Sequence, residues 1–176
     1  MNWTGEYVIE GDGLCHWRER MTIDDPELVK ACQDNPLTHL FVEMWAEMGV
    51  KVGVAYHHRA AVKGAGADCA MFPLRVYREC HVIPAGYEPP EYSSQWHLHR
   101  SEELYLTEIY KFAVETFCPP RPADFVVFKF GRTFSHGTIV VDWPLIVHSY
   151  IPHGVTLADA LSDAQLAARE MKCFEI

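Results

Sequence analysis

The pattern of apolar and polar positions changes after residue 120 of this chain. Residues 125–130, 138–142 and 145–150 are rich in β-branched and aromatic side chains, which suit a pleated, half-buried surface. Gly131-Arg132 and Trp143-Pro144 separate these runs and have the composition of tight turns. The pattern therefore predicts three consecutive antiparallel strands.

Elsewhere, apolar residues recur at the i, i+3, i+4 and i+7 spacing of amphipathic helices. The expected helices are a short one opened by Asp24-Asp25-Pro26, one from Asn35-Pro36 to Gly49, one capped by Asp68 that runs to residue 80, a long one from Ser101 to Pro119-Pro120, and a last one over 157–171. The expected buried stripes are Phe72, Val76 and Cys80 in the third helix, and Leu106, Ile109, Tyr110, Ala113 and Phe117 in the fourth.

The remaining segments complete the predicted organisation. Residues 6–9 and 14–23, separated by glycines, indicate an N-terminal β-hairpin, and residues 84–99 indicate a surface loop rich in Pro, Tyr and Trp. Helices followed by an antiparallel sheet define an α+β fold. We divide the chain into an N-terminal extension, residues 1–35, and one domain, residues 36–176.

Composition limits the function classes. The 176 residues are 49% apolar, and 15 basic against 24 acidic residues give a formal charge of −9. Nucleic-acid binding is not expected, because phosphate contacts need clustered Lys and Arg. The N-terminus lacks the pattern of a signal peptide, and no stretch has the apolar length of a membrane span. We expect a protein made in the cytoplasm.

Six cysteines are scattered without a Cys-x-x-Cys pair, so we expect buried free thiols and one reactive thiol. His57-His58 and His97-Leu98-His99 have spacings that could hold a metal, but a zinc site needs three or four converging ligands. We therefore expect surface histidines there, with no metal and no cofactor.

Cys69 is the candidate nucleophile. It follows Asp68 and the glycine-rich Gly64-Ala65-Gly66, at the predicted start of a helix. The positive end of a helix and a nearby imidazolium both lower a thiol pKa and favour the reactive thiolate. Backbone N–H groups at the helix start could also bind an oxyanion. The alternative is a buried, inert thiol, since cysteine is among the most buried residue types.

His136 and His148 are the candidate partners. His136 is expected to begin a strand directly after a turn, and His148 to lie near the end of the next strand. A tight turn at Trp143-Pro144 brings the two positions close together, so one imidazole can hydrogen-bond the other and fix its tautomer. The alternative is a pair of core histidines.

These residues lie in motifs that resemble a known family. Tyr56-His57-His58 and Gly64-Ala65-Gly66-Ala67-Asp68-Cys69 resemble the Tyr-x-His and Gly-x-Gly-x-Asp-Cys signature of NlpC-type cell-wall cysteine peptidases, most closely their phage-tail and gene-transfer-agent branch. The segments at 122–128, 135–140 and 145–149 resemble three strands of that family. The family usually continues Asp-Cys-Ser-Gly or Asp-Cys-Ala-Gly, whereas Cys69-Ala70-Met71 lacks this glycine. The other departures are Ala123 in place of a glycine and an insert at 84–100 without a counterpart.

The resemblance implies a papain-like fold, with the nucleophile at a helix N-terminus packed on an antiparallel sheet. It implies Cys69 as nucleophile, His136 as base, His148 as the residue that orients the base, and Tyr56 and Asp68 as site-lining residues. The implied reaction is cleavage of a γ-D-glutamyl–diaminopimelate amide, or a neighbouring one, in the stem peptide of peptidoglycan. The implied setting is a phage tail that acts at the host cell wall.

Two other functions stay open. A structural tail-tip subunit could keep the fold without the chemistry and use aromatic residues of the insert (Tyr87, Tyr92 and Trp96) to dock onto partner proteins. An acyltransferase or amidase that acts on another small substrate could use the same three residues, because a fold alone does not fix the reaction.

Overall fold

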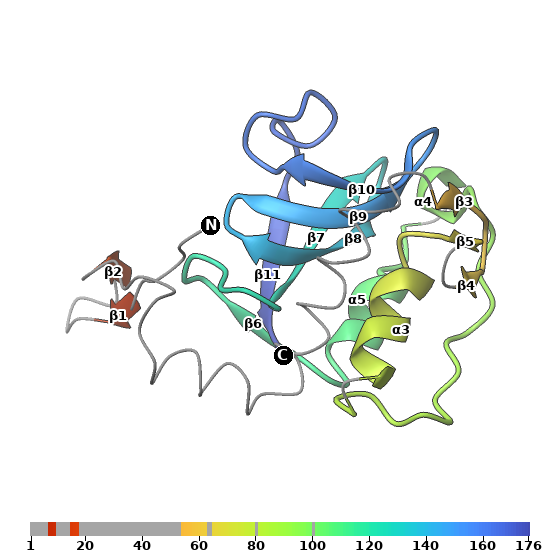
Figure 1. The fold of residues 1–176 in the computed structure, drawn as a ribbon, viewed down its shortest axis with the longest axis horizontal. Helices are drawn as coiled ribbons and strands as arrows, with labels where there is room; N and C mark the ends of the chain where they lie inside the picture. Colours follow the sequence, from red (N-terminus) through yellow and green to blue (C-terminus); the bar gives the residue numbers. More distant parts are fainter. Residues whose placement is uncertain (1–6, 10–14, 18–53, 63–64, 80, 100) are drawn as a thin grey trace.

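A six-stranded antiparallel sheet forms the centre of the protein (Figure 1). The computed structural model describes residues 7–9, 15–17, 54–62, 65–79, 81–99 and 101–176. The strands of the sheet lie in the spatial order β10 (Gly154–Asp159), β9 (Leu145–Tyr150), β8 (Thr133–Asp142), β7 (Phe125–Phe130), β11 (Met171–Glu175) and β6 (Val114–Thr116).

The three central strands confirm the predicted meander. β7 and β9 have the predicted bounds, and β8 begins at Thr133, five residues before the predicted start. Each neighbouring pair is antiparallel, with Phe125 opposite Ile139 and Thr138 opposite His148. The sequence pattern and the turn residues were sufficient here because every pairing is between neighbours in the chain.

Both faces of the sheet are buried. Along β7, Phe125 and Val127 point to one core and Val126 and Phe128 to the other, as the two-residue period of a strand requires. The first core contains residues of α3 (Met71–Glu79) and α5 (Leu104–Ile109). The second contains Leu166, from the segment between β10 and β11.

Smaller elements complete the described structure. A three-stranded sheet has the order β3 (Ala55–Tyr56), β5 (Gly66–Ala67) and β4 (Ala61–Val62), and a short helix, α4, spans Trp96–His99. The predicted hairpin is present as the antiparallel pair β1 (Tyr7–Ile9) and β2 (Cys15–Trp17). The helices expected to start at Asp24 and Asn35 lie outside the described residues.

The predicted helix over 157–171 is wrong. Residues 154–159 instead form β10, which pairs along its whole length with β9, and residues 171–175 form β11. Between them, the Asp159 carboxylate accepts the backbone N–H groups of Leu161 and Ser162, an arrangement typical of turns. Long-range strand pairing therefore outweighs the local helical pattern.

The predicted long helix from Ser101 is also too long. It is confined to α5, and residues 114–116 leave it to pair with β11. Leu106, Ile109 and Ala113 are buried as expected, whereas Tyr110 is exposed and the side chain of Phe117 is 94% exposed. In α3, Val76 of the predicted stripe is buried and Phe72 is partly buried against the first core, whereas Cys80 lies outside the described residues. The other buried residues of α3 are Pro73, Leu74 and Tyr77.

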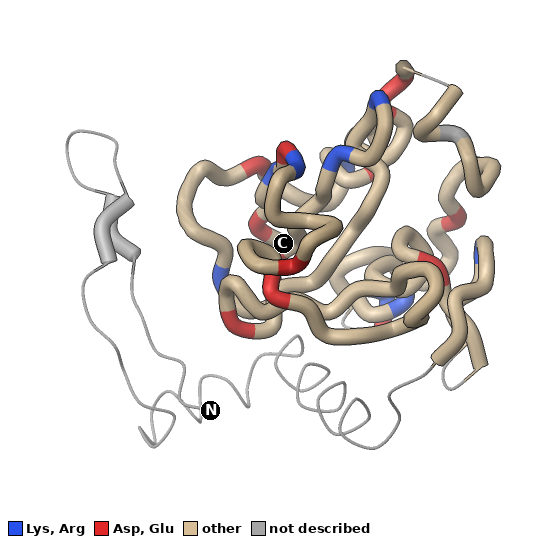
Figure 2. The backbone as a smooth tube through the Cα atoms, turned by 90° about the horizontal axis from the view of Figure 1, so that it is seen from above, with Lys and Arg blue, Asp and Glu red and all other residues tan. Residues whose placement is uncertain are grey.

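The α+β class is confirmed by this arrangement of helices on an antiparallel sheet. Figure 2 shows Lys and Arg interspersed with Asp and Glu along the described chain. Ion pairs such as Arg75–Glu79 and Lys129–Glu170 reflect this mixing. Among the described residues, no helix is long and apolar enough to cross a membrane.

Candidate active site

Asp68 and the start of α3 fix the position of Cys69. Asp68 Oδ1 accepts the backbone N–H groups of Ala70 at 3.1 Å and Met71 at 2.7 Å, which is the predicted helix cap. The side chain of Asp68 is almost fully buried, at 1% exposure. Cys69 is therefore held at the entrance to the helix by a rigid, hydrogen-bonded turn.

His136 and His148 are brought together by the register of β8 and β9. Thr138 lies opposite His148, so His136 is the diagonal neighbour of His148 on the same face of the sheet. The two rings meet in a hydrogen bond between His136 Nε2 and His148 Nδ1, with 2.7 Å between the nitrogen atoms. Both residues are buried. His136 is the fourth residue of β8, so the expectation that it begins a strand is wrong.

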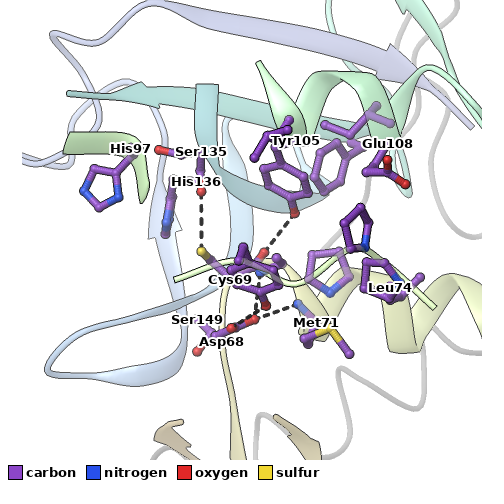
Figure 3. Close-up of a pocket in the computed structure, with 18 of the residues that line it drawn as sticks. Asp68, Cys69, Met71, Leu74, His97, Tyr105, Glu108, Ser135, His136 and Ser149 are labelled. Atoms are coloured by element: carbon purple, nitrogen blue, oxygen red, sulfur yellow. Dashed lines mark hydrogen bonds between the residues drawn. The ribbon is translucent and has the colours of Figure 1, made fainter. Parts of the chain in front are cut away.

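The loop that carries Cys69 packs directly on β8 (Figure 3). The thiol donates to the carbonyl oxygen of Ser135 at 3.6 Å, and the hydroxyl of Tyr105 donates to the carbonyl oxygen of Cys69 at 3.1 Å. A Cβ at Gly137 would overlap the Tyr105 hydroxyl and lie 3.0 Å from the Cys69 carbonyl oxygen. This close approach requires glycine at 137 and places His136 beside the thiol.

The thiol and both imidazoles are held in their neutral forms. Burial, followed by the charge of Asp68, raises the pKa of Cys69 to about 12, against smaller opposing effects of the N–H groups of Gly137 and Cys69. Burial lowers the pKa of His136 well below its usual value and that of His148 to about 4. The prediction that the helix start lowers the thiol pKa is therefore wrong, because burial outweighs it.

A cavity of about 470 Å³ opens at the candidate nucleophile. Tyr56, Asp68, Cys69 and His136 all line it, whereas His148 is absent from its lining and reaches it only through its bond to His136. The walls are mainly apolar and aromatic, a composition typical of a binding site for small molecules or peptides. Four of the five predicted site residues therefore face one cavity.

Only part of the helix start is free to bind an oxyanion. The N–H groups of Ala70 and Met71 are already bonded to Asp68, whereas the N–H groups of Cys69 and Gly137 are directed at the Cys69 sulfur. Tyr56, at the end of β3, is half-buried beside it. Burial and the nearby Cys69 and Asp68 raise the pKa of the Tyr56 phenol, which keeps it a hydrogen-bond donor.

The structure adds site residues that the sequence reasoning missed. Ser149 Oγ donates to the carbonyl oxygen of Ala67 at 2.7 Å, and Tyr92 donates to Asp68. The glycine directly after His136, where a strand was expected to begin, was a signal for the close approach at Gly137. Tyr92 was expected only as a docking residue, and no local pattern singled out Tyr105. The expectation that Tyr87 and Tyr92 are exposed is wrong, because both are partly buried in the cavity wall.

Among the described residues, no group of three or more His, Cys, Asp or Glu side chains converges as a metal site would require. Cys69 and Cys173 are free thiols, but Cys118 is disulfide-bonded, which corrects the expectation of a free thiol there. No protein-family model matches the chain, and no curated protein is significantly similar to it in sequence. The motif resemblance and the site geometry are therefore the basis for a function.

Proposed function

We propose that this protein is a papain-like thiol peptidase that cleaves an amide bond in the stem peptide of peptidoglycan. The observation that carries the proposal is that Cys69 and His136 line one cavity, while His136 is hydrogen-bonded to the buried His148 behind it. A nucleophile, a base and a residue that orients the base are the three parts that acyl transfer through a thiol needs. The family motifs around Cys69 and His136 support the cell-wall substrate and the phage-tail setting.

The neutral resting site indicates how the reaction starts. When a substrate carbonyl lies over Cys69, the thiol proton passes to Nδ1 of His136 as sulfur attacks the carbonyl carbon. This step requires the tautomer with the shared proton on His136, so that Nε2–H donates to Nδ1 of His148 and orients the base while it becomes charged. The carbonyl oxygen takes the negative charge and accepts the N–H of Cys69, with the Tyr56 hydroxyl as a second candidate donor.

The second half returns the site to its starting state. His136 protonates the leaving amine, the C–N bond breaks, and an acyl-thioester remains on Cys69. A water molecule, deprotonated by His136, then attacks the thioester carbonyl and releases the acid and the thiol. The proposed bond is the γ-D-glutamyl–diaminopimelate amide or a neighbouring one.

Digestion of purified peptidoglycan tests this proposal, with the released stem fragments identified by mass spectrometry. Cys69→Ala is expected to abolish the release of fragments and to keep the fold. Cys173→Ala, a change at the other free thiol, is the matched control and is expected to cleave at the wild-type rate. Equal cleavage by Cys69→Ala and wild type, or no cleavage by wild type, would contradict the proposal.

A second candidate is a structural tail-tip subunit that retains the fold without activity. The neutral, buried state of Cys69 and the missing glycine after it favour this function. Slow alkylation of the resting thiol is expected for both candidates, since only the thiolate reacts quickly. Cleavage by the wild-type protein, abolished in Cys69→Ala, is therefore the observation that separates them.

A further inference from the structure

The insert at 84–100 contributes a wall of the cavity. Its residues Pro89–Ser94 line the space in front of Cys69. From this wall, the hydroxyl of Tyr92 donates to Asp68 Oδ2 at 2.6 Å, and the backbone N–H of Arg59 donates to the same oxygen at 2.7 Å. The carboxylate beside the candidate nucleophile is therefore capped on one oxygen by the helix start and on the other by Tyr92 and Arg59.

The ring of Tyr92 has its own supports, independent of its hydroxyl. The ring of His58 packs edge-on against it with 5.1 Å between centroids, and the guanidinium of Arg59 lies 5.6 Å from its centroid. His58 Nε2 lies 3.1 Å from the backbone oxygen of Tyr92, and Arg59 pairs with Glu91 at 3.0 Å. A phenylalanine at this position is therefore expected to keep the same place.

We propose that Tyr92 is a positioning residue of the Cys69 site, whose hydroxyl acts on the thiol through the Asp68 carboxylate. The effect of Tyr92 on turnover rests on the proposed function, whereas the effect of Tyr92 on the thiol pKa does not depend on any substrate. Each donor to Asp68 disperses negative charge that would otherwise act on the neighbouring sulfur.

Removal of the Tyr92 hydroxyl leaves Asp68 Oδ2 with one fewer donor, and the more concentrated charge disfavours the thiolate. The ionisable groups that line the cavity with Cys69 include Tyr56, His58, Asp68, Tyr92, Tyr105 and His136. His58 Nδ1 lies 3.6 Å from Asp68 Oδ2, and the exposed Glu91 carboxylate pairs with Arg59. Asp68 is the neighbour whose charge raises the pKa of the Cys69 thiol, since burial keeps the tyrosines protonated and His136 neutral.

The test measures the alkylation rate of Cys69 by iodoacetamide at several fixed pH values, with the modified peptide quantified by mass spectrometry. A rise of about one unit in thiol pKa reduces the thiolate tenfold and makes each thiolate about threefold more nucleophilic, so Tyr92→Phe is expected to react about threefold more slowly. Tyr110→Phe, which removes an exposed tyrosine–carboxylate bond to Glu115, is the matched control and is expected to react at the wild-type rate.

Asp68→Asn provides the second arm, because its Oδ1 can still accept the N–H groups of Ala70 and Met71 and the amide carries no charge. Its Nδ2 cannot accept the Arg59 N–H, so circular dichroism checks that the variant keeps the fold. Asp68→Asn is expected to speed alkylation, and Tyr92→Phe added to it is expected to have no further effect. A wild-type rate in Tyr92→Phe, or the same slowing with and without the Asp68 charge, would overturn the inference. If peptidoglycan cleavage fails while this coupling is present, the proposed function is wrong and the positioning role stands.

Discussion

The buried histidine pair predicts a specific dependence of stability on pH. Burial holds the pKa of His148 at about 4 in the folded chain, against an ordinary value of 6.5 in the unfolded chain. As the pH falls below 6.5, the unfolded chain takes up a proton that folded His148 does not bind. The contribution of neutral His148 is therefore complete above pH 6.5 and is lost as the pH falls through 4.

The magnitude follows from these two values. Linkage gives a loss of about 3 kcal/mol of unfolding free energy between pH 7 and pH 4 from this one group. The side chain is only 3% exposed, so solvent does not screen the effect. A typical domain has a total stability of about 5–15 kcal/mol, which makes the loss easy to measure.

The assay is urea unfolding followed by tryptophan fluorescence at pH 7, 5.5 and 4, for wild type and His148→Asn. Asparagine removes the titrating group and keeps an oxygen acceptor for His136 Nε2. From pH 7 to 4, wild type is expected to lose about 3 kcal/mol more than the variant, or about 1–3 M in the difference of midpoints. His81→Asn, at an exposed histidine, is the matched control. Parallel profiles for wild type and His148→Asn would refute the reasoning.

Two further predictions concern neighbouring positions. Gly137→Ala is expected to lose about 1–3 kcal/mol of stability and most activity, because its Cβ would lie 2.5 Å from Phe125 Cζ and overlap Tyr105; urea unfolding checks this, and Gly86→Ala, where nothing lies within 4 Å, is the control. Burial raises the pKa of Asp124 from 3.8 to about 6, so the folded chain binds a proton at a higher pH than the unfolded chain does. The folded state is therefore stabilised relative to the unfolded state as the pH falls from 7 to 4. Wild type is expected to gain about 2 kcal/mol of unfolding free energy from this group between pH 7 and pH 4, and Asp124→Asn is expected to lack this gain. If wild type and Asp124→Asn differ in unfolding free energy by the same amount at both pH values, the prediction is contradicted.

Local patterns predicted the parts of the fold that are local. The meander of β7, β8 and β9 follows from residue composition and two turns, and it brings His136 and His148 together within one hairpin. The cap at Asp68 is also local, because a carboxylate bonds N–H groups two and three residues ahead. These features could be predicted because their partners are close in sequence or joined by one short turn.

Long-range pairing decided the parts that the sequence could not predict. Residues 114–116 and 157–159 leave their predicted helices because β11 and β9 offer strand partners. The contact of Cys69 with Ser135 spans 66 positions, and the bond of Tyr92 to Asp68 spans 24. No period of two or 3.6 residues carries information about such contacts.

The neutral state of Cys69 and His136 means that the site holds no reactive thiolate before a substrate binds. A resting thiolate beside an imidazolium would attack any electrophile that enters the cavity, since the thiolate is the reactive form. In this protein, burial and Asp68 keep Cys69 protonated, and burial keeps His136 neutral. In the proposed reaction, the proton would move only when a bound carbonyl accepts the sulfur and its oxygen gains the N–H of Cys69. Selectivity would therefore depend on how the substrate is positioned over a protonated, unreactive thiol. The residues that hold Asp68, Cys69 and His136 in place would then be as important for the reaction as the nucleophile itself.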